Sequence, residues 1–165
     1  MKNNHSSVDI FFMSEALNEA MKALETKNWP VGCVIVLDGK VVSRGYNQVY
    51  SSTNKIMHAE IMAMMKIASL LSEYGNKADL YVTYEPCPMC FGAALLNHFR
   101  RIVYGTDIDG SGGLNLRDHL NYRFKEDKYK IDITSGVLES KCREVFLQGD
   151  PVKKLPQFSE LIRNV

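Results

Sequence analysis

The chain has 165 residues, of which 45% are hydrophobic and 24% charged, and a net charge of +1. This length and composition can supply the core of one globular domain, so we expect a single domain over residues 1–165. No apolar run approaches the roughly 20 residues that cross a bilayer, and residues 1–7 do not resemble an export signal, so we expect a cytoplasmic protein. The small net charge excludes a global positive field, and any RNA-binding surface must be local.

Hydrophobic periodicity and turn residues predict alternating helices and strands along the chain. Apolar side chains recur at helical spacing over residues 8–26, which predicts an amphipathic helix. Strands at 31–37 and 40–46 flank Asp38-Gly39, a dipeptide typical of a tight hairpin turn. Further helices are expected at 58–73, from 87 to about 98, and at 139–147, further strands at 80–84, 101–104 and 129–133, and a short segment at 158–162. This alternation predicts an α/β fold.

Two short motifs place metal-binding side chains at the starts of two predicted helices. Residues 58–60 read His-Ala-Glu, and residues 85–90 read Glu-Pro-Cys-Pro-Met-Cys. One imidazole and two thiolates make three good zinc ligands, and three protein ligands leave a position for water, as in catalytic zinc sites. Zinc lowers the pKa of a bound water from near 16 to roughly 7. The sequence therefore predicts a zinc site formed by His58, Cys87 and Cys90.

The carboxylate of Glu60 is predicted to handle protons rather than to bind the metal. Residues two apart on a helix project about 200° apart, so Glu60 and His58 need not compete for one coordination position. Displacing an amino group from an aromatic ring requires water to add and a proton to reach the departing nitrogen, and a nearby carboxylate can transfer both protons. His-x-Glu followed by Pro-Cys-x-x-Cys is also the signature of zinc nucleobase deaminases.

Each motif alone has another interpretation. Cys-x-x-Cys can be a redox pair, but a redox pair explains neither His58 nor Glu60. A structural zinc site would close a fourth protein ligand around the metal, and the candidates are Cys33, Cys142 and His119. Cys33 lies in an apolar run and is expected to be a core side chain. No ligand spacing ties Cys142 or His119 to the two motifs.

Segments outside the metal motifs strengthen the resemblance to the cytidine deaminase-like superfamily, and within it to bacterial tRNA adenosine deaminases. They read Trp-Pro-Val-Gly at 29–32, Gly-Tyr-Asn at 45–47, Leu-Tyr-Val-Thr at 80–83, Val-Tyr-Gly at 103–105 and Ile-Thr-Ser-Gly-Val-Leu-Glu at 133–139. The resemblance implies a three-layer α-β-α fold with a five-stranded mixed sheet between helical layers, usually assembled as a homodimer or larger oligomer. It also implies that Glu60 shuttles protons beside zinc, that Asn47 hydrogen-bonds the substrate, and that the Ala59 amide and Pro86 carbonyl orient the reacting ring.

The implied reaction is hydrolytic deamination of a nucleobase with release of ammonia, and the first candidate substrate is adenosine in a tRNA anticodon loop. Salvage of a free base or nucleoside, guanine or cytosine first, is the alternative. The small net charge favours salvage. So do residues 54–57, which read Asn-Lys-Ile-Met where the tRNA adenosine deaminases and guanine deaminases both usually have Asp-Pro-Thr-Ala. A third hypothesis is a zinc-stabilised RNA-binding module without activity.

An editing enzyme must hold an unstacked base and its neighbours, which calls for aromatic platforms and cationic phosphate contacts. The candidate aromatics are Tyr46, Tyr84, Phe124 and Phe158. The local basic candidates are Arg100, Arg101, Arg123, Lys125, Lys128, Lys130, Lys153 and Lys154. Core packing is the default interpretation for the aromatic side chains, and a solvated face is the default for the basic ones.

Overall fold

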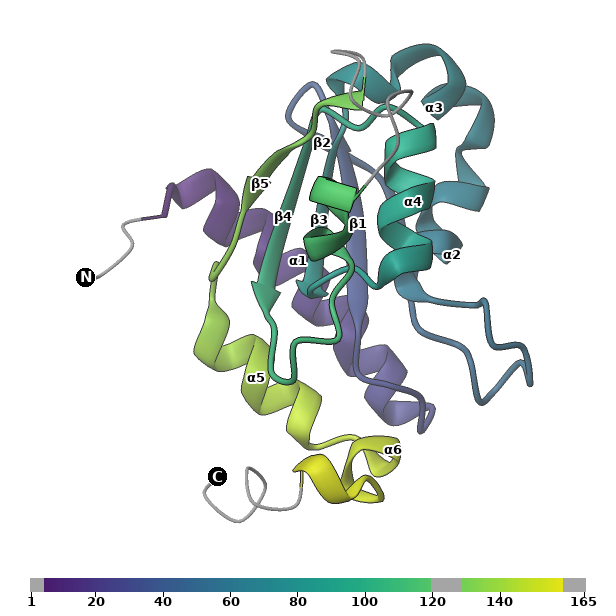
Figure 1. Cartoon of the computed structure of the whole chain (residues 1–165), viewed down its shortest axis with the longest axis vertical. Coiled ribbons are helices and arrows are strands. Elements are labelled where there is room, and N and C mark those ends of the chain that lie inside the picture. Colours follow the sequence, from purple (N-terminus) through teal and green to yellow (C-terminus); the bar gives the residue numbers. More distant parts are fainter. Residues whose placement is uncertain (1–4, 120–128, 159–165) are drawn as a thin grey trace.

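The computed structural model describes residues 5–119 and 129–158. Within these residues five strands form a sheet in the order β2-β1-β3-β4-β5, with helices on both of its faces (Figure 1). The strands are β1 (Gly32–Leu37), β2 (Lys40–Tyr46), β3 (Asp79–Tyr84), β4 (Arg101–Thr106) and β5 (Asp132–Thr134). β1 pairs antiparallel with β2 and β3, whereas β3, β4 and β5 run parallel. The predicted three-layer fold with a mixed five-stranded sheet is confirmed.

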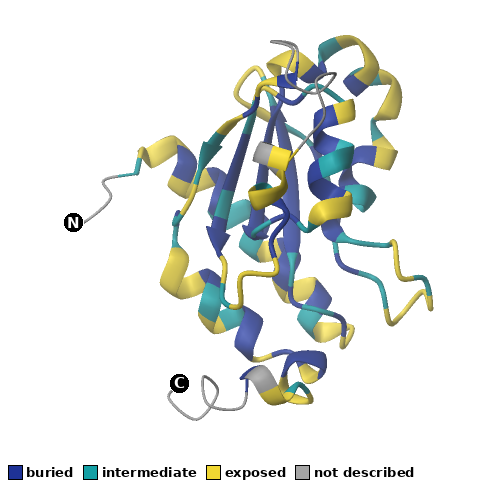
Figure 2. Ribbon diagram, viewed as in Figure 1, coloured by how far each residue is buried: buried dark blue, intermediate teal, exposed yellow. Residues whose placement is uncertain are grey.

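The two faces of the sheet are covered by different helices. One face carries α1 (Ser7–Glu25) and α5 (Glu139–Leu147), and the other carries α2 (Ala59–Lys66), α3 (Ala68–Tyr74) and α4 (Pro88–Leu96). Successive side chains of a strand point to opposite faces. Val34 therefore packs on the face covered by α1, and Cys33 packs on the face covered by α2. Because both faces are buried, β1 reads as a continuous apolar run, and the central strands β1 and β3 are almost entirely buried, dark blue in Figure 2.

The predicted hairpin and most predicted boundaries agree with the structure. Asp38 and Gly39 both have positive φ, 49° and 72°, as the tight turn requires. The predictions for β2 and α5 coincide with the structure, and those for α1, β1, β3 and β4 differ by one or two residues at either end. None of the helices in the described ranges is long and apolar enough to cross a membrane.

Two predicted elements are wrong or incomplete, and one helix was not predicted. The helix expected at 58–73 is interrupted at Ile67, whose φ of −129° and ψ of 30° are not helical. The periodicity hid this break because Met64, Ile67 and Leu71 keep helical spacing and all pack on one core cluster. The last strand begins at Asp132 rather than at 129. A short helix, α6 (Asp150–Lys153), was not predicted, and the segment expected at 158–162 lies outside the described residues beyond 158.

A glycine in β2 sets how closely α2 approaches the sheet. A Cβ on Gly45 would lie 2.2 Å from the carbonyl oxygen of Ala59 and 2.6 Å from the amide nitrogen of Ala63. Only a residue without a side chain permits this contact between backbones. Gly45 therefore fixes the position of α2, and with it the residues at the N-terminus of that helix.

Candidate active site

His58, Cys87 and Cys90 meet at the N-termini of α2 and α4. His58 is the residue that precedes α2, Cys87 precedes α4, and Cys90 lies in the first turn of α4. Their ligand atoms all lie within 4.8 Å of one another, and His58 Nδ1 is 3.5 Å from Cys87 Sγ. Zn–N and Zn–S bonds of usual length in a tetrahedron place nitrogen and sulfur about 3.5 Å apart. The donor set and its spacing therefore fit zinc.

The electrostatics of the two thiols also suit a metal. A hydrogen bond from Cys90 lowers the pKa of Cys87 to about 4, and the hydrogen bond with His58 acts in the same direction. The same interaction with Cys87, together with burial, raises the pKa of Cys90. Thiolate rather than thiol is the metal ligand, so one sulfur is a ready ligand, while the second requires a cation to displace its proton.

The imidazole of His58 also interacts with a residue that is not a metal ligand. Its hydrogen bond with Cys87 raises the pKa of His58, and a hydrogen bond to the backbone carbonyl of Lys55 acts in the same direction. A partner of this kind on the ring fixes the tautomer and orientation of a metal-binding histidine. The loop that ends in Lys55 therefore helps to aim Nδ1 at the two sulfurs.

Glu60 lies next to the three ligand residues without joining them. Its side chain is 3% exposed, and burial raises its pKa to about 7 despite a hydrogen bond from Cys90. A carboxyl group that titrates near neutral pH can both accept and donate a proton. The arrangement agrees with the predicted division of labour between metal ligands and a proton-transfer group.

A cavity of about 270 Å³ opens beside this group. Its apolar wall contains closely packed aromatic rings, with the ring centres of Tyr84 and Phe146 4.4 Å apart and those of Trp29 and Phe146 6.0 Å apart. The residues that line the cavity are Trp29, Val31, Asn47, Val49, His58, Glu60, Tyr84, Glu85, Cys87, Asp109, Ser111, Phe146, Leu155 and Phe158. An apolar and aromatic hollow with a few convergent polar groups is typical of a small-molecule or base-binding pocket.

The predicted substrate-binding residues differ in their positions. Asn47 is buried and lines the cavity, and its Oδ1 accepts a hydrogen bond from the Val49 amide at 3.1 Å, so its NH₂ group remains to face a ligand. Ala59 and Pro86 adjoin the ligand residues but do not line the cavity. The Pro86 carbonyl already accepts a hydrogen bond from the Gly113 amide at 2.7 Å. Contacts of all three with substrate remain predictions.

Among the described residues, none of the candidates for a fourth protein ligand joins the group of His58, Cys87 and Cys90. Cys33 is fully buried in the core, where burial raises its pKa. Cys142 packs in the cluster on the opposite face of the sheet, and His119 is exposed. In the part of the chain that the structure describes, His58, Cys87 and Cys90 are the sole His, Cys, Asp or Glu group with metal-binding spacing. A closed structural zinc site is thus not supported.

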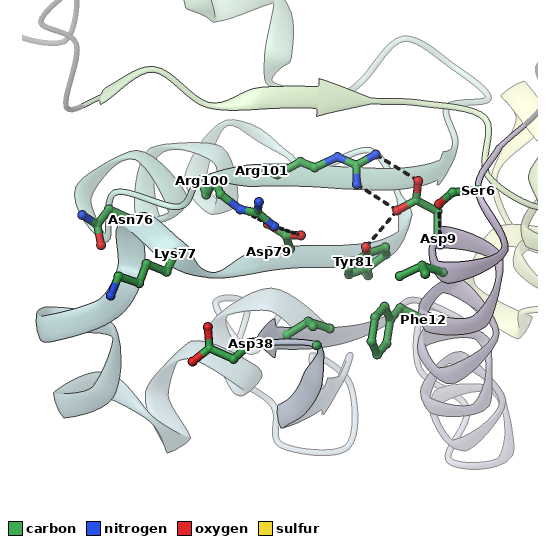
Figure 3. A pocket seen from close by; sticks show the side chains of 13 residues that line it. Ser6, Asp9, Phe12, Asp38, Asn76, Lys77, Asp79, Tyr81, Arg100 and Arg101 are labelled. Carbon is green, nitrogen blue, oxygen red and sulfur yellow. Dashed lines mark hydrogen bonds and ion pairs between the residues drawn. The ribbon is translucent and has the colours of Figure 1, made fainter.

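A larger cavity of about 490 Å³ lies at the opposite end of the strands, next to Arg100 and Arg101 (Figure 3). Arg101 forms hydrogen bonds of 2.9 and 3.0 Å to Asp9, and Arg100 forms hydrogen bonds of 2.9 and 2.6 Å to Asp79. The two arginines are therefore neutralised far from the metal group. Arg123, Lys125, Lys128 and Phe124 lie outside the described residues.

Of the basic candidates, Lys153 and Lys154 adjoin the active-site cavity. Both are exposed at the end of α6, immediately before Leu155, which lines the cavity. Trp29, Val49 and Phe146 also form part of the cavity wall, and they are not among the residues predicted from the sequence. The Trp-Pro-Val-Gly motif was a signal for Trp29, but no local pattern marked the other two.

Comparisons with known proteins agree with this geometry. Residues 6–106 match the family model described as the cytidine and deoxycytidylate deaminase zinc-binding region. A tRNA-specific adenosine deaminase of Streptococcus pyogenes serotype M1 is 36% identical over 88% of this chain and 87% of its own. The enzyme of the same description from Bacillus subtilis strain 168 is 35% identical over 81% of this chain and 83% of its own.

Solved structures give the same result. A structure from studies of A-to-I editing by tRNA:A34 deaminases at the wobble position of transfer RNA superimposes with a TM-score of 0.68. It is 35% identical and covers 82% of this chain and 98% of its own. Together with the three-ligand metal group, these likenesses establish that the chain belongs to the cytidine and deoxycytidylate deaminase family of zinc-dependent hydrolytic deaminases.

Proposed function

We propose that this deaminase converts adenosine to inosine in a tRNA anticodon loop, with release of ammonia. The observation that carries the proposal is the identity of 35–36% to tRNA-specific adenosine deaminases over more than four-fifths of both chains. The likeness therefore extends beyond the segments that carry the metal motifs. The adenosine-containing anticodon loop is therefore the substrate to test first.

In the proposed reaction, water adds to C6 of adenine and the amino group departs as ammonia. Zinc, when bound by His58, Cys87 and Cys90, supplies the Lewis acid that activates water at neutral pH. Glu60 takes a proton from the attacking water, delivers a proton to the ring nitrogen, and then protonates the departing amine. Its burial beside Cys90, with a pKa of about 7, supports both directions of transfer.

The remaining predicted residues would orient the base. Asn47 is a buried side chain on the cavity wall, and its NH₂ group has no acceptor among residues 5–119 and 129–158. In the proposed complex it donates to the base or its ribose, while the Ala59 amide and the Pro86 carbonyl contact the reacting edge of the ring. The Tyr84 and Phe146 rings supply the apolar wall against which a flat base can pack.

Exposed lysines around the cavity support an RNA substrate. Each lies within three residues of a cavity-lining residue in the sequence: Lys27, Lys55, Lys153 and Lys154. Within the described residues none of the four forms an ion pair. Unpaired cations of this kind can bind phosphates, although the net charge of the chain is only +1.

A substrate panel tests the proposal. Zinc-loaded protein is incubated with adenine, guanine and cytosine, with their nucleosides, and with an anticodon stem-loop that contains adenosine, and ammonia and products are measured. Conversion of the stem-loop to inosine without conversion of the free compounds supports editing. Conversion of a free base or nucleoside instead would overturn the RNA assignment and establish salvage, and no conversion by folded, zinc-loaded protein would favour a non-catalytic module.

We further propose that the chain forms a homodimer in the cytoplasm. Met65 on α2 and Leu96 on α4 are large apolar side chains that remain exposed on neighbouring helices, and burial against a second copy would remove them from water. Sedimentation equilibrium measures the oligomeric state. A monomer at all concentrations would contradict the proposal.

A further inference from the structure

The loop from Asn47 to Asn54, between β2 and α2, is rigidly built. Each of its backbone N–H groups has a hydrogen-bond acceptor, and the acceptors are Val31 O, Met57 O, Asn47 Oδ1, Asn28 Oδ1 (twice), Gln48 O, Tyr50 O and Val49 O. Loops on a protein surface are usually held by fewer internal bonds and move more. This loop is therefore held in one conformation before any ligand arrives.

Asn28 joins this loop to the end of α1. Its Oδ1 accepts hydrogen bonds from the amides of Tyr50 at 2.8 Å and Ser51 at 3.0 Å, and its Nδ2 donates to Ser51 Oγ at 3.0 Å and to Thr26. The Asn28 side chain is fully buried. A buried amide with all its hydrogen bonds satisfied specifies one geometry, because any movement leaves a polar atom unpaired.

The loop presents one aromatic ring to solvent, on a residue that directly follows a cavity-lining residue in the sequence. Tyr50 is 54% exposed, although its own amide is bonded to Asn28. The preceding residue, Val49, lines the cavity. The Tyr50 ring is thus mostly exposed although its loop is held in one conformation. Packing within the fold does not account for this exposure.

We propose that Tyr50 is a stacking platform for the nucleotide next to the target base, and that Asn28 positions it. The inference rests on the proposed RNA substrate and identifies a part of the enzyme that reads the strand outside the cavity. A base flipped into the cavity leaves its neighbour unstacked, and an exposed ring next to the opening can replace the lost stacking. Lys55, the residue that follows this loop, is exposed and can contact a phosphate of the strand.

The inference is tested with stem-loops that carry the target adenosine. One substrate is intact, and two others have an abasic site in place of the nucleotide on the 5′ or on the 3′ side of the target. We expect Tyr50→Ala to lower kcat/KM about tenfold on the intact stem-loop, since base–aromatic stacking has this magnitude. Wild-type enzyme and Tyr50→Ala should be equal on one of the two abasic substrates, and Tyr50→Phe should match the wild type on all three.

Phe11→Ala is the matched control. Phe11 is 58% exposed on α1, next to residues that line the cavity at the opposite end of the strands. Its loss should leave kcat/KM unchanged, and zinc content and melting temperature should be the same in both alanine variants. Asn28→Ala should resemble Tyr50→Ala in the stem-loop assay.

The results separate a failure of the Tyr50 stacking platform from a failure of the proposed function. If wild-type enzyme converts the intact stem-loop and Tyr50→Ala is equally active, the platform is overturned and the proposed function stands. If Tyr50→Ala is equally impaired on intact and both abasic substrates, stacking on a neighbouring base is also overturned. If the wild-type enzyme leaves the stem-loop unconverted, the proposed function and the platform both fall.

Discussion

Replacing Gly45 by alanine should disturb the metal group from a distance. The new Cβ would lie 2.2 Å from Ala59 O and 2.6 Å from Ala63 N, and real Cβ contacts essentially never come under 3.0 Å. Because both neighbours are backbone atoms, α2 must retreat by roughly 1 Å, at a cost of about 3 kcal/mol for overpacking. His58 and Glu60 stand at the start of this helix, and a misplacement of about 1 Å can lower a rate about 100-fold.

The assay combines urea unfolding with zinc titration and ammonia release. Gly45→Ala should unfold at lower urea, bind zinc more weakly and release ammonia about 100-fold more slowly. Gly92→Ala is the matched control, since a Cβ there meets nothing within 4 Å, and alanine in α4 should raise stability by about 1 kcal/mol. A Gly45→Ala protein with wild-type stability, zinc affinity and rate would refute the packing argument.

Three further predictions follow from the structure. Burial alone would raise the pKa of Asp9, but hydrogen bonds from Arg101 and Tyr81 outweigh it and hold that pKa below its usual range. Asp9→Asn should therefore lower the free energy of unfolding by about 2 kcal/mol at pH 7. In urea unfolding at several pH values, the difference in stability between wild type and variant should shrink below about pH 4, where the wild type loses this contribution. A stability difference that stays constant down to pH 2 would contradict the assignment. Chelation of zinc should lower the melting temperature, because a ligand that binds only the folded state and is present at 1,000 times its Kd adds about 4 kcal/mol to the free energy of unfolding. Calorimetry with and without chelator measures this change. An unchanged melting temperature would argue against zinc at this site. Asn28→Ala should lower the free energy of unfolding measured in urea by about 2 kcal/mol, since the backbone amides that bond to Asn28 lose their hydrogen-bond acceptor. An unchanged free energy of unfolding would show that the loop does not depend on Asn28.

The metal group could be predicted because its information is local. His58 and Glu60 are separated by one residue, and Cys87 and Cys90 by two, so helix geometry alone relates their side chains. That the two helix starts come together could not be read from spacing and came from the family resemblance. The hairpin was equally local, because Asp38-Gly39 encodes its own turn.

Other features depend on contacts between residues far apart in the sequence. Arg100 and Arg101 read as a basic patch, but they pair with Asp79 and Asp9. The support of the 47–54 loop comes from Asn28, more than 20 residues away from its partners Tyr50 and Ser51. The exposure of Tyr50 likewise depends on how the loop lies on the folded protein, so periodicity could not distinguish it from a core residue.

The most direct test of the account is inosine formation in an adenosine-containing anticodon stem-loop by wild-type enzyme and Glu60→Gln under single-turnover conditions, with zinc content measured in both. Glutamine keeps the size of the side chain but cannot transfer protons. We predict equal zinc content, inosine and ammonia in equal amounts from the wild type, and a loss of at least about 100-fold in the variant. A Glu60→Gln enzyme with full zinc and wild-type turnover would contradict the assignment of Glu60 as the proton-transfer group.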